Sequence, residues 1–115
     1  MFDGCCGPLL AGTAQAPTAE RLMRSRFTAF ALQDAAYLQR TWHPSSRPET
    51  IEFDDDLIWR RLLIIDTSAG GPFDRDGIVE FEAFWRQGEQ RGSMHERSRF
   101  VRESREWFYV DGDVQ

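Results

Sequence analysis

The spacing of apolar residues changes once along the 115-residue chain, and this change restricts the folds open to it. Up to about position 42, apolar residues recur at every third or fourth position, the period of a helix with one buried face. From Trp59 onward, short apolar runs and alternating segments are separated by Gly, Pro and charged residues, which is typical of strands. Two helices followed by consecutive strands with short polar connections predict an α+β domain with an antiparallel sheet.

Two helices are expected in the first half of the chain. Thr18 fits the N-cap of the first helix because its hydroxyl can accept a hydrogen bond from a free backbone N–H. Asp34 is expected to cap a second, short helix that carries residues up to Trp42. Prolines at positions 44 and 48 end this helix. The apolar stripe of the first helix consists of Leu22, Met23, Phe27, Phe30 and Ala31.

Four strands are expected in the second half, over residues 62–65, 78–85, 94–101 and 107–110. A connection over residues 87–92 would set the register of the middle pair. In that register, Glu82 lies opposite Arg97. Glu80 then lies opposite Arg99, and the two pairs form a ladder of opposite charges on one face of the sheet.

The last hairpin determines which polar residues face the helices. If residues 104–105 form its tip, Tyr109 lies opposite Phe100 and Asp111 lies opposite Ser98. Because side chains alternate between the faces of a strand, this register predicts a polar cluster among the apolar residues of the inner face. Its four members are Glu96, Ser98, Tyr109 and Asp111.

Glu96 is the sharpest candidate for chemistry. A carboxyl group in an apolar cavity has a raised pKa, which suits a general acid or base. Alternatively, Glu96 lies at the cavity mouth and binds a backbone amide or an arginine such as Arg24 or Arg26. His43 is a further candidate for the pocket, although its place near a helix C-terminus explains a histidine without any catalytic role. His95 is expected on the outer face, as a surface partner.

Charge and composition exclude several classes of function. The net charge of −5 argues against nonspecific nucleic-acid binding, which needs a basic surface. No apolar run approaches the ~20 residues that a membrane-spanning helix needs, so no membrane insertion is expected. The two cysteines are adjacent and cannot build a disulfide framework. With no secretory signal pattern at the start, these features favour a cytoplasmic protein.

Several separated segments resemble one family of bacterial proteins. The first comprises residues 5–10, which begin Cys5-Cys6-Gly7-Pro8, with residues 17–30. The second comprises residues 95–103 with residues 107–112. The Thr-Trp-His-Pro-Ser segment at residues 41–45 fits the same pattern. Together they resemble the YchJ-like family. This resemblance implies an NTF2-like (cystatin-like) α+β fold over residues 17–115, in which the N-terminal helices pack on the concave side of a curved antiparallel sheet. It also implies that residues 1–16 are a linker and the remnant of a SEC-C motif.

The resemblance also bears on metal binding and partners. In the SEC-C motif, a Cys-x-Cys-Gly-Ser-Gly segment and a following Cys-Cys or Cys-His pair bind zinc or iron. Cys5 and Cys6 match the closing pair, and the opening segment is missing. Two vicinal thiols supply at most two of the four ligands that structural zinc requires, so no cofactor is expected in this chain. Zinc or iron is expected only in a form that carries the whole motif.

Three functions are open at this point. The first is a noncatalytic interaction module of the protein-export or ribosome-associated machinery, as the resemblance implies. The second is a small-molecule-binding or enzymatic pocket centred on Glu96. The third is a homodimerisation module that pairs through the outer face of its sheet, although a charged ladder there disfavours a dry interface.

Overall fold

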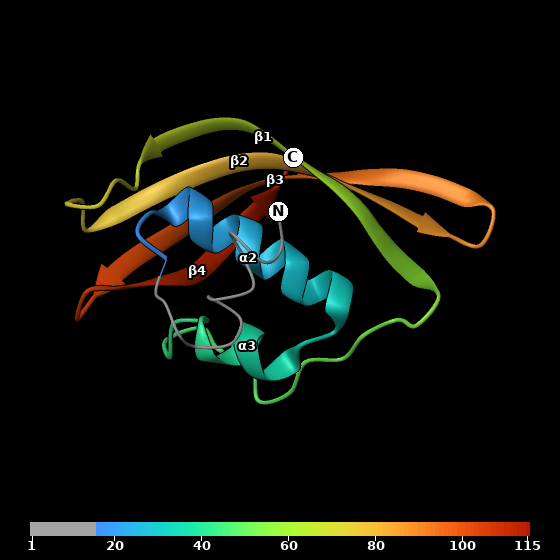
Figure 1. Cartoon of the computed structure of the whole chain (residues 1–115), viewed down its shortest axis with the longest axis horizontal. Coiled ribbons are helices and arrows are strands. Elements are labelled where there is room, and N and C mark those ends of the chain that lie inside the picture. The colour runs from blue at the N-terminus through green and yellow to red at the C-terminus, as the bar shows by residue number, and fades with distance from the viewer. Residues whose placement is uncertain (1–15) are drawn as a thin grey trace.

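The computed structural model describes residues 16–115, which form two helices followed by an antiparallel sheet (Figure 1). The elements are α2 (Ala19–Leu32), α3 (Ala35–Arg40), β1 (Leu57–Ala69), β2 (Asp76–Gln87), β3 (Gln90–Glu103) and β4 (Glu106–Val114). The strands lie in the order β1-β2-β3-β4, so the predicted α+β meander is confirmed. In this part of the chain, neither helix is long and apolar enough to cross a membrane.

Both helices begin where the sequence predicts. The Thr18 hydroxyl accepts a hydrogen bond from the backbone N–H of Arg21 at 3.1 Å. The Asp34 carboxylate accepts one from the backbone N–H of Tyr37, also at 3.1 Å. Each side chain satisfies a backbone donor that the first helical turn leaves free. The predicted N-caps are therefore confirmed.

The end of the second helix differs from the prediction. α3 ends at Arg40, and Trp42 lies beyond it in a short parallel bridge with Tyr109 of β4. The Tyr109 N–H donates to the Thr41 carbonyl at 2.9 Å, and the His43 N–H donates to the Tyr109 carbonyl at 2.8 Å. These bonds compete with helical ones for the same backbone groups, so the chain leaves the helix early.

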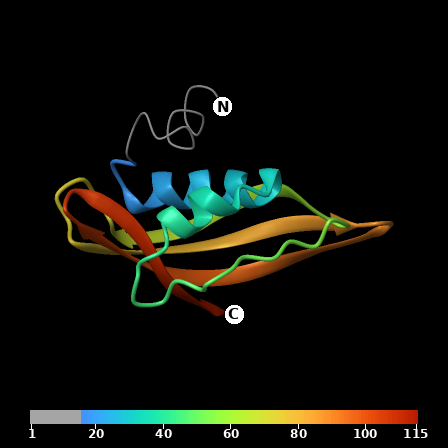
Figure 2. The same ribbon diagram turned by 90° about the horizontal axis from the view of Figure 1, so that it is seen from below.

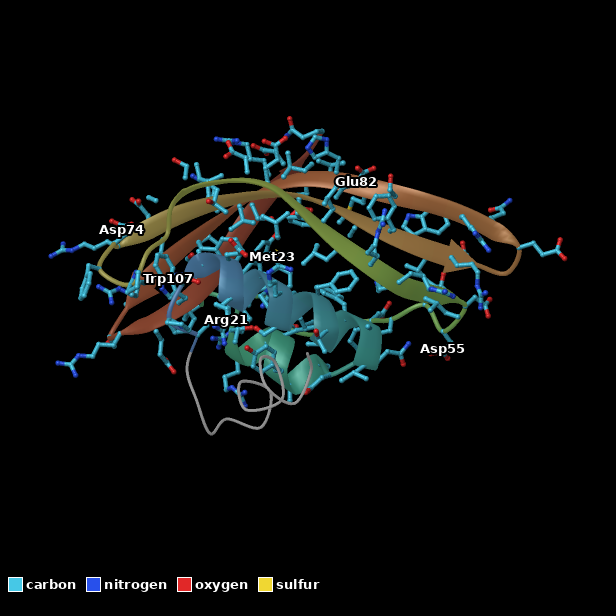
Figure 3. The ribbon with its side chains drawn as sticks, turned by 45° about the horizontal axis from the view of Figure 1, so that its top comes forward. Arg21, Met23, Asp55, Asp74, Glu82 and Trp107 are labelled. Carbon is cyan, nitrogen blue, oxygen red and sulfur yellow. The ribbon has the colours of Figure 1, made fainter. Side chains whose placement is uncertain are left out.

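The helices cover one face of the sheet, which arches over α2 (Figures 1 and 2). α2 contacts β1, β2 and β4, and α3 packs against α2. Met23 lies between α2 and the sheet, whereas Glu82 projects from the opposite face of the sheet (Figure 3). The core between the layers includes Leu22, Leu38, Val79, Phe81, Phe100 and Trp107.

The register between β2 and β3 differs from the prediction by two residues. Glu80 lies opposite Arg97, and Glu82 lies opposite His95. The connection consists only of Gly88 and Glu89, because the strands continue to Gln87 and Gln90. A shift by two residues keeps every side chain on its predicted face, so the expected split between the inner and outer faces survives.

A bulge changes the register between β3 and β4. Phe100 pairs with Tyr109 as predicted, but the register shifts between Arg99 and Phe100. Beyond the shift, Asp111 lies opposite Arg99 and not opposite Ser98. A one-residue slip turns the following side chains to the other face of the sheet. Asp111 therefore points outward, and its predicted place in the inner cluster is wrong.

Candidate functional site

A cavity of about 270 Å³ lies between α2 and the concave face of the sheet. Most of its lining is apolar, and the polar members come from α2, β3 and β4. Such a mostly apolar cavity with a few convergent polar groups is the usual form of a small-molecule site. The lining residues are Met23, Arg26, Phe27, Phe30, Trp42, Trp59, Phe81, Ala83, Met94, Glu96, Ser98 and Tyr109.

Glu96 lies in this cavity, as the sequence predicts. Its Oε2 accepts a hydrogen bond from the Ser98 hydroxyl at 2.5 Å and a longer one from the Tyr109 hydroxyl at 3.5 Å. Ser98 has no exposed surface. Gly112 lies beneath the carboxylate, and a Cβ atom there would come within 2.1 Å of Oε2. The missing side chain of Gly112 thus makes room for Glu96.

Arg26 is the buried cation of the cavity, with 2% of its surface exposed. Its Nη1 donates to the Leu38 carbonyl at 2.9 Å and to the Thr41 hydroxyl at 2.7 Å. The guanidinium carbon lies 5.1 Å from the ring centre of Trp42 and 4.6 Å from that of Tyr109. Both distances allow cation–π attraction.

Burial lowers the pKa of Arg26 to about 10, because desolvation disfavours the charged form. The nearby Tyr109 and Glu96 act against this shift. Burial also raises the pKa of Tyr109 to about 12, with a contribution from Glu96. At neutral pH, Arg26 is therefore a cation and the Tyr109 hydroxyl is a hydrogen-bond donor.

Trp42 also lines the cavity and carries a further donor, its indole N–H. Its indole N–H is buried and has no acceptor among residues 16–115. The Trp42 ring meets the Tyr109 ring edge to face, with centroids 5.0 Å apart. An unpaired buried N–H is uncommon, because it costs free energy comparable to a lost hydrogen bond.

Two predicted pocket residues lie elsewhere. Asp111 forms a two-point ion pair with Arg99 on the outer face, at 2.6 and 2.5 Å, and half of its side chain is exposed. This contact lowers the pKa of Asp111 through the hydrogen bonds and the charge of Arg99. His43 is not in the cavity lining and belongs to a separate network near the β3–β4 turn.

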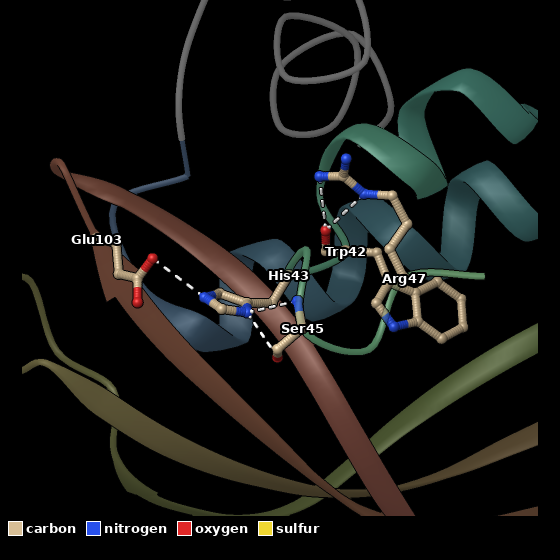
Figure 4. A network of polar contacts seen from close by, with 5 residues as sticks. All are labelled: Trp42, His43, Ser45, Arg47 and Glu103. Carbon is tan, nitrogen blue, oxygen red and sulfur yellow. Dashed lines mark hydrogen bonds and ion pairs between the residues drawn. The ribbon is translucent and has the colours of Figure 1, made fainter. Parts of the chain in front are cut away.

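That network joins His43 to Ser45 and Glu103 (Figure 4). His43 Nδ1 lies 2.7 Å from the Ser45 hydroxyl and accepts the Ser45 backbone N–H at 3.1 Å. These bonds assign the ring proton to Nε2, which donates to Glu103 at 3.0 Å. The ring also packs edge to face on Phe108. His43 thereby fastens the segment after α3 to the sheet.

Of the remaining predicted residues, one lies on the surface and two lie outside the described part of the chain. His95 lies on the outer face, as predicted, where its Nε2 is 2.6 Å from Glu80. Cys5 and Cys6 lie outside the described residues. Across residues 16–115, there is no group of three or more His, Cys, Asp or Glu side chains arranged to hold a metal ion.

Two donor-bearing residues of the cavity were not predicted as pocket residues: Arg26, which the sequence suggests only as a partner of Glu96, and Trp42. Arg26 follows Leu22 by four positions and precedes Phe30 by four, so it lies on the apolar stripe of α2. An arginine within an apolar stripe of a helix indicates a buried charge, and this feature is visible in the sequence. The importance of Trp42 depends on the bridge to β4, which has no signal in the local sequence.

The chain has relatives in sequence and in fold. The family model described as "YchJ, middle NTF2-like domain" matches residues 18–112. The chain belongs to the YchJ-like family. This YchJ-like chain is 49% identical over 112 residues to a UPF0225 protein from Streptomyces coelicolor, which covers 97% of the chain and 87% of the relative. It is also 49% identical to a UPF0225 protein from Polaromonas naphthalenivorans, with 97% and 81% covered.

Two solved structures share the fold of the YchJ-like chain. The solution structure of a SEC-C motif containing protein from Rhodopseudomonas palustris matches with a TM-score of 0.86 and 35% identity, covering all of this chain and 92% of that one. A crystal structure of a SEC-C motif containing protein from Psychrobacter arcticus matches with a TM-score of 0.79 and 26% identity, covering 100% and 73%. The YchJ-like assignment made from the motifs is confirmed, as is the NTF2-like domain.

Proposed function

We propose that this domain binds a small molecule with an apolar body and one polar end in the cavity beneath the sheet. The observation that carries the proposal is the lining itself. Aromatic rings and methionines form most of the wall, and Arg26, Glu96 and Tyr109 supply polar atoms. An apolar body would gain about 25 cal/mol for each Å² removed from water. The polar groups would fix its orientation.

A thermal-shift screen of a fragment library with a cavity-filling variant tests this proposal. Ala83 lines the cavity and is 2% exposed, so Ala83→Leu adds three carbon atoms to the space that a ligand would use. We expect several fragments to raise the melting temperature of the unmodified protein and to lose this effect with Ala83→Leu. Ala31→Leu is the matched control, because Ala31 is exposed on α2. The proposal fails if no fragment stabilises the protein, or if Ala83→Leu responds as Ala31→Leu does.

The carboxylate of Glu96 gives this pocket a second capacity, because it can accept a hydrogen bond or a proton from a bound molecule. Whether the pocket also supports a reaction is tested by Glu96→Gln, which keeps the shape and removes the base. Asp111→Asn is its control on the outer face. Turnover of any bound compound that survives Glu96→Gln would exclude an acid or base role for Glu96.

A second proposal concerns partners and follows from the structural relatives. Both solved neighbours are SEC-C motif containing proteins, and Cys5-Cys6 matches the closing pair of that motif. We propose that the domain acts in the cytoplasm as a noncatalytic accessory of the protein-export or ribosome-associated machinery. A pull-down with the natural full-length protein should recover a translocation factor, a chaperone or ribosomes. Recovery of none of these would count against it.

Metal binding is proposed only for a form with the complete motif. Cys5 and Cys6 alone provide two thiolates, whereas a structural zinc site needs four ligands. These two residues therefore do not fit a closed zinc or iron site by themselves. Elemental analysis of the natural full-length protein, with Cys5→Ser and Cys6→Ser as variants, tests whether they contribute ligands.

Self-association is proposed through the outer face of the sheet, at β1, the strand along one edge. Leu63 and Ile65 are 49% and 46% exposed on this strand. An exposed apolar edge strand favours pairing with another chain. Sedimentation velocity at several concentrations should show a dimer that Leu63→Lys disrupts. A constant monomer mass over the whole range would refute this proposal.

A further inference from the structure

The charge of Arg26 lacks an ionic partner in the described part of the protein. None of the ion pairs within residues 16–115 includes Arg26. Yet its side chain is almost fully buried. A buried charge is costly unless an opposite charge and hydrogen bonds compensate it. Here, a carbonyl, a hydroxyl, two aromatic faces and the charge of the nearby Glu96 provide part of that compensation, and no acidic side chain within residues 16–115 pairs directly with the guanidinium.

One edge of the guanidinium is unused. Both hydrogen bonds that Arg26 makes to residues 16–115 come from Nη1, which leaves Nε and Nη2 without an acceptor in that range. These two groups form the fork that binds a carboxylate through two parallel hydrogen bonds. Arg26 lines the cavity, so a ligand there can reach the side chain. The unpaired indole N–H of Trp42 lies on the ring next to the guanidinium.

Resting on the proposed function, we infer that the ligand is a small monocarboxylic acid. Its carboxylate pairs with the free edge of Arg26, and its hydrocarbon part lies along the wall formed by residues such as Phe27, Phe30 and Trp59. The single cation and the apolar wall suit one negative charge on an apolar body. A phosphate dianion would bring a second negative charge, and the lining holds no second arginine or lysine among residues 16–115 to pair with it.

Glu96 limits the affinity of the cavity for a carboxylic acid and provides a test of the sign of the ligand's charge. It lies in the same cavity and is held by Ser98 and Tyr109. Its negative charge repels a second carboxylate, so Glu96→Gln should tighten the binding of an acid by several-fold. The same change should leave an uncharged analogue nearly unaffected. A ligand with a positive charge would respond in the opposite direction.

The decisive experiment compares acids with their primary amides on the unmodified protein. Suitable probes are hexanoate, octanoate, phenylacetate and 4-phenylbutanoate, each titrated at pH 7 beside its amide and followed by NMR. We expect the best acid to bind at least about tenfold more tightly than its amide, since hydrogen bonds to charged groups contribute about 1.5–3 kcal/mol. This comparison needs no variant, so it holds even if a substitution at Arg26 prevents folding.

Two arginine variants then assign the preference to one residue. Arg26→Gln should abolish the preference for the acid, and Arg26→Lys should restore part of it by returning the charge without the fork. Arg24→Gln is the matched control, because Arg24 is on the same helix, pairs with Glu20 and does not line the cavity. An amide that binds as tightly as its acid overturns this inference and leaves the proposed function standing. If neither class binds, both fail.

Discussion

At the scale of single residues, the polar end of the cavity depends on a glycine on the neighbouring strand. Glu96 reaches across to β4 and occupies the space that a side chain on Gly112 would fill. There it meets Ser98 and Tyr109, which fix the position of its carboxylate. The sequence predicted the inward direction of these three polar residues correctly, because alternation along β3 and β4 decides it.

A substitution at Gly112 tests this arrangement. Gly112→Ala should push the Glu96 carboxylate away from the Ser98 hydroxyl, since the new Cβ would lie 2.6 Å from Glu96 Cδ. Loss of the hydrogen bonds should lower the free energy of unfolding by about 1–2 kcal/mol. Urea unfolding provides the measurement. In a Glu96→Ala background the same substitution should cost much less, and an equal cost in both backgrounds would contradict the account.

The environment of Tyr109 predicts a pH effect. Its pKa is about 12 in the folded protein and about 10 in the unfolded chain. Because the folded pKa is the higher one, Tyr109 contributes stability that is complete below pH 10 and lost as the pH rises through 12. Ultraviolet titration should show late ionisation of Tyr109, and Tyr109→Phe should remove the contribution of one tyrosine from the late part of the curve. Ionisation of Tyr109 near pH 10 in the folded protein would be inconsistent with a buried hydroxyl.

At the scale of elements, the turns and one bulge determine what the sequence could and could not predict. The alternation of charged and apolar residues in β2 and β3 determines which side chains face the helices. The length of the connection determines the register, and this connection consists only of Gly88 and Glu89. The bulge beside Arg99 has no local signal, because it arises where β4 also pairs with the segment after α3. For this reason the predicted face was wrong for Asp111, whereas it was correct for Glu96, which precedes the bulge.

The tip of the last hairpin offers a stabilising substitution. Ser104 and Arg105 have φ values of 52° and 68°, the signs that a type I′ turn requires. A residue other than glycine costs roughly 1–2 kcal/mol in this conformation. Arg105→Gly should therefore raise the free energy of unfolding by up to about 1 kcal/mol, measured by urea unfolding. Gly88→Ala, at φ 62° in the other turn, should lower it, and a stabilising effect of Gly88→Ala would contradict this reasoning.

At the scale of the whole molecule, the cavity follows from the way the layers meet. The sheet arches over α2 (Figure 1), and large side chains from both layers line the space without filling it. The sequence predicted the layers and the inner face. The burial of Arg26 among these side chains could not be predicted from the sequence, nor could its lack of an ion pair within residues 16–115. Both depend on where α3 and β4 lie relative to α2.

The four tryptophans allow a direct test of the central claim that the cavity binds a small molecule. Trp42 and Trp59 line the cavity, whereas Trp85 and Trp107 do not. The measurement is a proton–nitrogen NMR spectrum of the indole groups during titration with the acids and amides named above. Binding in the cavity should shift the Trp42 and Trp59 signals and leave those of Trp85 and Trp107 nearly unchanged. Signals that stay fixed with every compound, or shifts confined to Trp85 and Trp107, would contradict the account.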